Sequence, residues 1–166
     1  MEAETMLEFS FSASNQRIQI SGFTLIELLV TLSIIGILSV LALPSFSEFV
    51  GGQRVKTASF EVFSSLTYAR SEAIKRNAEV AVTSASGGWQ NGWTVAVVNG
   101  STLNQQTAFT GLTIAGPAGS ITYNGSGRLK ASVTPFTISS STGTSVSPRC
   151  ISIDLSGRPN SKIGNC

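Results

Sequence analysis

The feature that most constrains this chain of 166 residues is an apolar run over residues 23–43. The run reads FTLIELLVTLSIIGILSVLAL, and an α-helix of that length, at about 1.5 Å per residue, measures roughly 32 Å. This matches the hydrocarbon core of a bilayer, so the sequence predicts one membrane-spanning helix. A cleaved secretory signal peptide is one alternative, but the run is longer than a signal-peptide core and no Ala-x-Ala site follows it. A buried core helix is another, but a helix that is apolar all round needs a larger protein to enclose it.

The composition narrows the chemistry that the chain could perform. It has no histidine and only two cysteines, which excludes Ser-His-Asp and Cys-His catalysis and a four-thiolate zinc site. The carboxylates beyond the apolar run lie mostly along one predicted helix without an evident catalytic partner: Glu48, Glu61, Glu72, Glu79 and Asp154. We therefore expect no enzymatic activity, no cofactor and no metal. A membrane-anchored enzyme is a distant alternative.

One carboxylate, Glu27, interrupts the apolar run. A charged side chain at the centre of a bilayer costs roughly 2.5–3.5 kcal/mol, so Glu27 calls for a partner of opposite charge. No lysine or arginine lies within one helical turn of it. Cleavage after Gly22 would place a new α-amino group on Phe23, which is four residues from Glu27 and about one turn away.

Residues 22–27, Gly-Phe-Thr-Leu-Ile-Glu, resemble the leader-cleavage site of type IV pilins and type II secretion pseudopilins. The resemblance implies that a prepilin peptidase cuts after Gly22 and that Phe23 is then N-methylated. It also implies that Glu27 meets the terminal amine of a neighbouring subunit during filament assembly. Residues 1–22 would be the leader, which is long and acidic for this family, so that Met6 is an alternative start.

After Pro44 the pattern changes to that of an amphipathic helix, which we expect to continue the apolar helix over residues 44–77 and to stop at Asn77. Its apolar positions recur at three- and four-residue spacing and mark one face for a sheet to cover: Val55, Ala58, Val62, Leu66, Ala69 and Ala73. Residues 68–77, YARSEAIKRN, resemble the end of the first helix in the GspH/FimT (FimU) family of minor pilins and pseudopilins.

Residues 78–166 form the β-rich part of the chain. Short alternating runs are separated by Gly, Pro and Ser clusters, and Asn99-Gly100 is a hairpin signal. Trp89 and Trp93 lie in a Gly-Trp-x-x-Gly-Trp pattern that also resembles the family, and we expect them to pack in the core. The predicted fold is α+β: a long hydrophobic-then-amphipathic N-terminal helix packed on a C-terminal antiparallel β-sheet or sandwich, as in pilins.

The two cysteines, Cys150 and Cys166, are sixteen residues apart. In an extracytoplasmic domain they would be oxidised to a disulfide, and free thiols are the alternative. A C-terminal disulfide is more typical of the FimT and FimU members of the family than of pseudopilin H, so it favours a pilus.

Residues 121–128 and 151–158 are similar, because each is an alternating run that enters a Ser-Gly-Arg turn. Each turn presents one arginine, Arg128 or Arg158. Together with three nearby cations, these arginines could form a basic patch that binds phosphates. The three cations are Lys130, Arg149 and Lys162. Alternatively, the two turns could be solvated hairpin ends. In FimT-type pilins a C-terminal Gly-Arg-x-Arg loop is implicated in DNA binding. Here only Arg158 is retained, with Asn160 in the second place and Lys162 as a substitute.

These features together predict a minor pilin or pseudopilin of a type IV pilus or a type II secretion pseudopilus. Its partners would be a prepilin peptidase, other pilins or pseudopilins and the bacterial inner membrane, with the C-terminal domain in the periplasm. DNA binding during uptake is the alternative function, with DNA as a further partner.

Overall fold

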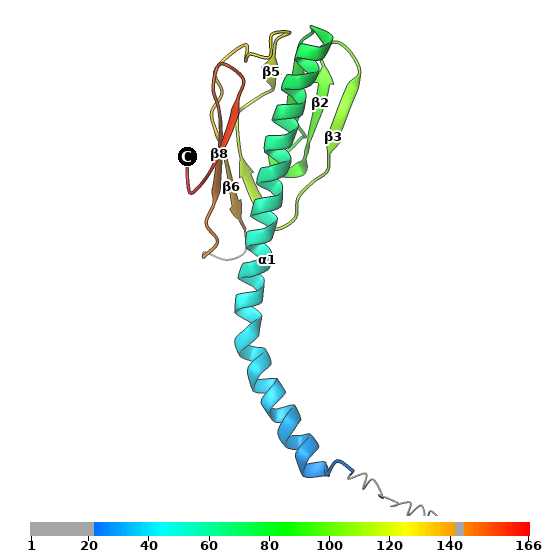
Figure 1. Ribbon diagram of the computed structural model, residues 1–166, viewed down its shortest axis with the longest axis vertical. Coiled ribbons are helices and arrows are strands. Elements are labelled where there is room, and N and C mark those ends of the chain that lie inside the picture. Colours follow the sequence, from blue (N-terminus) through cyan, green and yellow to red (C-terminus); the bar gives the residue numbers. More distant parts are fainter. Residues whose placement is uncertain (1–21, 142–144) are drawn as a thin grey trace, which may run out of the picture. The chain divides into compact units, whose positions relative to one another are not determined.

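The computed structural model describes residues 22–141 and 145–166, with the backbone alone for residues 41–45. The predicted leader lies outside the described residues, apart from Gly22. The chain divides into two units, residues 1–39 and 40–166. Figure 1 shows one long helix followed by a set of short strands.

Helix α1 runs over Leu25–Arg76 and contains 52 residues. It begins after Thr24, whose hydroxyl accepts a hydrogen bond from the Glu27 N–H at 3.3 Å, as an N-cap does. It ends at Asn77, the predicted stop, which has a positive φ of 47°. The N–H groups of Asn77 and Ala78 donate to the carbonyls of Ile74 and Ala73, respectively, which is the hydrogen-bond pattern of a Schellman cap. Among the described residues, no helix combines the length and apolar character needed to cross a membrane.

In the part of the chain that the structure describes, the strands form two four-stranded sheets in which every neighbouring pair is antiparallel. Sheet A has the order β3-β2-β1-β5, and its strands are β1 (Val80–Ser84), β2 (Trp93–Val97), β3 (Thr102–Gln106) and β5 (Ile121–Tyr123). Sheet B has the order β4-β6-β7-β8, and its strands are β4 (Leu112–Ala115), β6 (Phe136–Ser140), β7 (Arg149–Ile153) and β8 (Pro159–Ile163). A short 3-10 helix, η1 (Trp89–Asn91), precedes β2.

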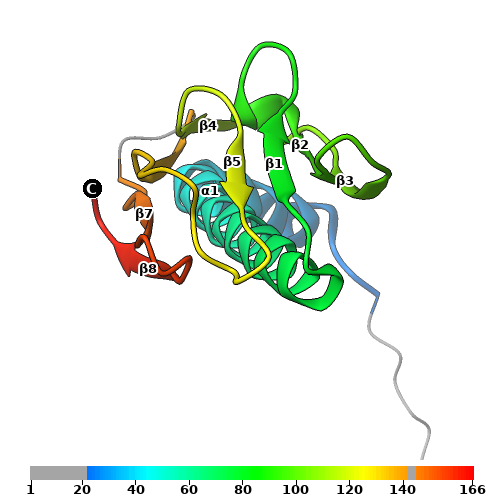
Figure 2. The ribbon, with the colours of Figure 1, turned by 90° about the horizontal axis from the view of Figure 1, so that it is seen from above.

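Both sheets curve around the C-terminal part of α1 (Figure 2). The six helix residues predicted to face a sheet are all buried, with at most 3% of their surface exposed: Val55, Ala58, Val62, Leu66, Ala69 and Ala73. The largest side chains in the core come from the sheets and include Trp93, Tyr123 and Phe136. The predicted fold class, a long N-terminal helix packed on an antiparallel β domain, is confirmed.

The two tryptophans pack in the core as expected. Trp89 lies edge-on to Phe136, with ring centroids 4.8 Å apart, and its indole N–H donates to the Pro117 carbonyl at 2.9 Å. Trp93 stacks on Phe109 at 5.7 Å. These contacts join residues near η1 to both sheets.

Two strands, β3 and β8, have no alternating apolar run in the sequence, although the Asn99-Gly100 hairpin signal precedes β3. Each is an edge strand whose side chains are mostly exposed. Neither therefore shows the alternation of buried apolar and exposed polar residues that identifies a strand in a sequence. The Asn99-Gly100 signal does mark the β2–β3 connection, where the Gly100 N–H donates to the Val97 carbonyl at 2.9 Å. Both strands are therefore held by pairing with a buried neighbour rather than by burial of their own.

Candidate functional site

The predicted cleavage site lies just before α1 begins. Gly22 is exposed with no neighbouring heavy atom within 4 Å of its would-be Cβ, and the Phe23 ring is exposed. Glu27 lies in the first turn of α1, also exposed, and takes part in none of the ion pairs found in the described residues. The predicted cleavage bond is therefore accessible, and the Glu27 carboxylate is open to a partner from outside the chain.

The rest of this helix segment, up to residue 39, presents an apolar surface in all directions. Its large apolar side chains are between 50% and 77% exposed. Three hydroxyl groups interrupt the run, and each donates to a carbonyl of its own helix: Thr31 to Leu28, Ser33 to Leu29 and Ser39 to Ile35. Such internal hydrogen bonds satisfy hydroxyl groups that must enter an apolar environment.

A disulfide joins Cys150 and Cys166, with Cα atoms 5.1 Å apart, so the predicted pair is confirmed. Cys150 is buried in β7, and Cys166 follows β8. The bond thus ties the end of the chain to an inner strand of sheet B.

The two Ser-Gly-Arg turns have equivalent hydrogen bonds. In the first, the Asn124 carbonyl accepts from the Gly127 N–H at 2.8 Å, and the Asn124 side-chain oxygen accepts from the Arg128 N–H at 3.0 Å. In the second, Asp154 accepts in the same two ways from Gly157 and Arg158, at 2.9 and 3.0 Å. The sequence similarity therefore reflects one turn conformation that occurs twice.

The Asp154 carboxylate also accepts a hydrogen bond from the Ser156 hydroxyl. This bond, followed by the one from the Arg158 N–H, lowers the pKa of Asp154 below its usual value. Asp154 is therefore ionised at neutral pH and partly offsets the charge of Arg158.

The two turns lie against each other. Gly157 has a positive φ of 81°, and a Cβ there would overlap the carbonyl oxygen of Gly127. The same carbonyl accepts a hydrogen bond from the Arg70 Nε of α1 at 3.0 Å. Sequence reasoning missed Arg70, because its partner is 57 residues away and no spacing rule connects them.

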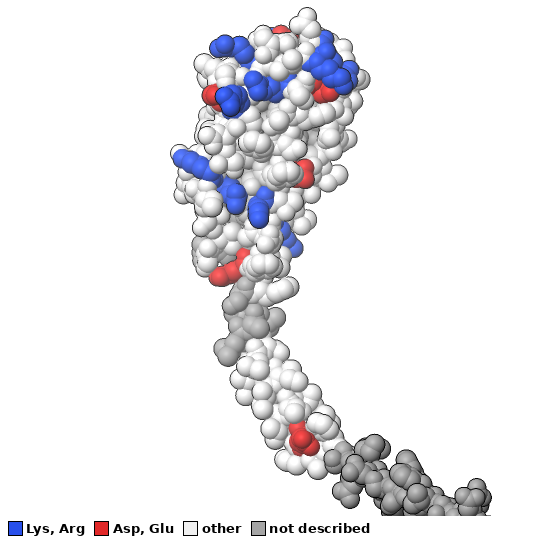
Figure 3. Space-filling view, viewed as in Figure 1, with Lys and Arg blue, Asp and Glu red and all other residues white. Residues whose placement is uncertain are grey.

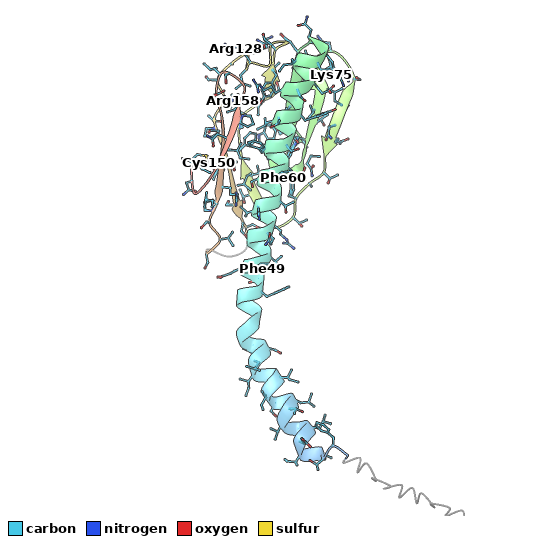
Figure 4. The ribbon with its side chains drawn as sticks, in the orientation of Figure 1. Phe49, Phe60, Lys75, Arg128, Cys150 and Arg158 are labelled. Atoms are coloured by element: carbon cyan, nitrogen blue, oxygen red, sulfur yellow. A yellow bond between two sulfur atoms is a disulfide. The ribbon has the colours of Figure 1, made fainter. Side chains whose placement is uncertain are left out.

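The structure brings some of the predicted basic residues together and separates others. Arg128 and Arg158 lie near the end of the domain where α1 ends (Figure 4). Lysine and arginine side chains gather at that end of the domain on the face shown in Figure 3. Lys130 forms an ion pair with Glu79 at 2.8 Å, so its charge is compensated.

The remaining two predicted cations lie on strands further from the paired turns. Arg149 begins β7, whereas the second turn follows the other end of that strand. Lys162 lies on β8 opposite Cys150, about 13 Å along the strand from Arg158 at roughly 3.3 Å per residue. The arrangement at the turns is therefore two predicted arginines and Arg70, rather than a continuous patch of five cations.

Type IV pilin-like proteins have this architecture: an N-terminal helix with a cleavage and methylation motif that packs on antiparallel sheets. The family described as type II transport protein GspH matches residues 58–157, and the prokaryotic N-terminal methylation motif matches residues 19–43. The chain belongs to the GspH family. Its role is that of a minor pilin or pseudopilin of type IV pilus or type II secretion systems, a class of structural proteins.

Two crystal structures of the type IV minor pilin FimU from Pseudomonas aeruginosa strain PAO1 are similar to this chain. One has 25% sequence identity and a TM-score of 0.56, over 64% of this chain and 91% of the FimU chain. The other has 23% identity and a TM-score of 0.59, over 69% and 92%, and it shows likeness of fold. Comparison with curated protein sequences gives no match.

The contact between the turns predicts the effect of Gly157→Ala. An alanine would be strained by the positive φ and would also push the Gly127 carbonyl away, so we expect unfolding free energy to fall by about 3 kcal/mol or more. Gly119→Ala is the matched control, because Gly119 has a φ of 83° with nothing within 4 Å of its would-be Cβ. It should cost only the strain of the left-handed backbone, about 1–2 kcal/mol. Denaturant unfolding followed by tryptophan fluorescence measures both, and equal losses would contradict the contact.

The disulfide predicts the behaviour of the thiols. The purified protein should react with no thiol reagent until it is reduced, and Cys166→Ser should lower the unfolding free energy by about 2–5 kcal/mol. Thiol titration before and after reduction, together with denaturant unfolding, checks this. Two reactive thiols in the native protein would show that the bond does not form.

Proposed function

We propose that this minor pilin or pseudopilin is cut after Gly22, anchored in the bacterial inner membrane through residues 23–43 and then built into a filament. Its C-terminal domain lies on the periplasmic side. The filament is a type IV pilus, where the chain acts in assembly, initiation or at the tip, and a type II secretion pseudopilus is the alternative. The chain performs no catalysis in this role.

The observation that carries this proposal is Glu27 at the start of an exposed apolar helix. The side chains around it are apolar, and the hydroxyl groups of that segment bond to their own helix. The Glu27 carboxylate therefore needs a positively charged partner from outside this segment. An N-methylated amine on Phe23 of a neighbouring subunit would supply the opposite charge in an environment that contains little water.

The disulfide supports the choice of a pilus and of the periplasmic side. Disulfides persist in the bacterial periplasm and are rare in the cytosol. Cys150 is buried and bonded to Cys166. The similarity to a type IV minor pilin points in the same direction.

Glu27→Ala tests the proposal. We expect the variant to be inserted and cut as the wild type is, because removal of the charge lowers the cost of burial. It should be lost from sheared filaments, because the partner amine then has no counter-charge. Mass spectrometry of the N-terminus and immunoblots of the filament fraction measure the two effects. Glu61→Ala, which removes a carboxylate further along the same helix, is the control and should behave as wild type.

Two results would count against this function. An intact Met1 or Met6 terminus in wild-type cells would exclude cleavage after Gly22. Normal incorporation of Glu27→Ala into filaments would exclude the role of the carboxylate.

A second function, DNA binding, is favoured by the contact between the paired turns. Arg128 and Arg158 directly follow the two glycines that touch, Gly127 and Gly157. Arg70 of α1 donates a hydrogen bond to the Gly127 carbonyl, so all three arginines belong to this corner of the domain. Guanidinium groups bind phosphates without regard to base sequence. Three such contacts would give duplex DNA a slope of log affinity against log salt of about −2.7.

Substitutions at the turns test this second function. Arg128→Ala and Arg158→Ala should each weaken binding at low salt and reduce the slope by about one unit. Lys75→Ala should leave the slope unchanged, because Lys75 pairs with Glu72 at 3.5 Å on α1. Anisotropy titrations of duplex DNA with the full chain in detergent, at several salt concentrations, measure these slopes. Absence of binding at low salt, or equal losses from all three substitutions, would leave the turns as ordinary hairpin ends.

A further inference from the structure

A groove beside α1 is used neither by the cleavage site nor by the paired turns. It consists of two adjoining hollows that share Phe60 and Phe63. The first, about 300 Å³, is lined by α1 and by Arg149 and Ser161 of strands β7 and β8. The second, about 340 Å³, continues along α1 as far as Ser71. We call these two hollows the Phe60 groove.

The floor of the groove is aromatic. Phe60 is 67% exposed although it lies on the part of α1 that packs against the sheets. Phe63 is half-buried and packs against the core, so one ring is anchored while the other is open to a ligand. Phe60 is therefore an exposed aromatic ring within reach of a ligand in either hollow.

The charges of the groove lie at one end. Lys56 of α1 and Arg149 of β7 both line the first hollow, and no carboxylate lines either hollow. Neither cation takes part in the ion pairs found in the described residues. The second hollow is lined by hydroxyl and aromatic side chains alone. The groove therefore fits an apolar segment with a carboxylate placed toward Lys56 and Arg149.

We propose that the Phe60 groove binds a segment of a neighbouring filament subunit that is apolar and carries an aspartate or glutamate. The proposal rests on the proposed function, which supplies other subunits as partners, and it names the surface and the chemistry of one contact. Single-stranded nucleic acid also binds aromatic side chains beside cations. It needs cations along its whole path, however, and this groove has them at one end only.

A photo-crosslinking amino acid in place of Phe60 tests the contact in the full chain in cells. We expect a cross-link to another subunit of the same filament, and mass spectrometry should locate it in an apolar peptide that contains a carboxylate. The same amino acid in place of Val98, which is exposed on the turn after β2, is the control and should not give this product.

Charge variants in the cross-linking background test the role of the cations. Lys56→Glu should reduce the yield about tenfold, because it sets like charges against each other, whereas Lys56→Arg should retain it. Lys162→Glu is the matched control, because Lys162 is an exposed cation that does not line the groove. It should leave the yield unchanged.

The outcomes separate this proposal from the proposed function. If the wild-type chain is missing from filaments, the proposed function fails. If the chain is present in filaments, any of four results overturns the groove proposal: no cross-link at position 60, a cross-linked peptide without a carboxylate, a cross-link to nucleic acid or lipid, or equal losses from Lys56→Glu and Lys162→Glu.

Discussion

Close packing of α1 against its two sheets is the interaction on which the domain depends. Three of the six buried apolar residues of the helix are alanine, at positions 58, 69 and 73, so the strands can approach the helix backbone. The volume of the core is supplied from the opposite side by Trp93, Tyr123 and Phe136. Because one helix face is sufficient to hold both sheets, side chains on the other face remain exposed, and Phe60 is one of them.

Much of this arrangement can be predicted from the sequence, because its signals are local. The apolar spacing from Val55 to Ala73 identifies the buried face, and Asn77 identifies the end of α1. The glycines of the repeated turns also act locally, since Gly127 and Gly157 both have the positive φ that these turns require. Such features depend on a few consecutive residues, and the structure reproduces them.

The parts that the sequence did not predict depend on distant partners. β3 and β8 have polar, exposed residues, and they are strands because β2 and β7 offer free edges. Arg70 lies on α1, and no local pattern connects it to the Gly127 carbonyl that it bonds. Sequence proximity places Lys130 with the turns, whereas the structure pairs it with Glu79. Proximity along the chain is a poor guide to which charges share a surface.

The carbonyl of Gly127 also has a consequence for the order in which the domain folds. It meets Arg70 from 57 residues earlier in the chain and abuts Gly157 from the last hairpin. Contacts between such distant segments form only after the entropy of closing long loops has been overcome. The end of the domain that bears the paired turns should therefore form late in folding, after the helix and its nearest strands. A chain that lacks its final hairpin would keep its local helix signals but could not complete this corner.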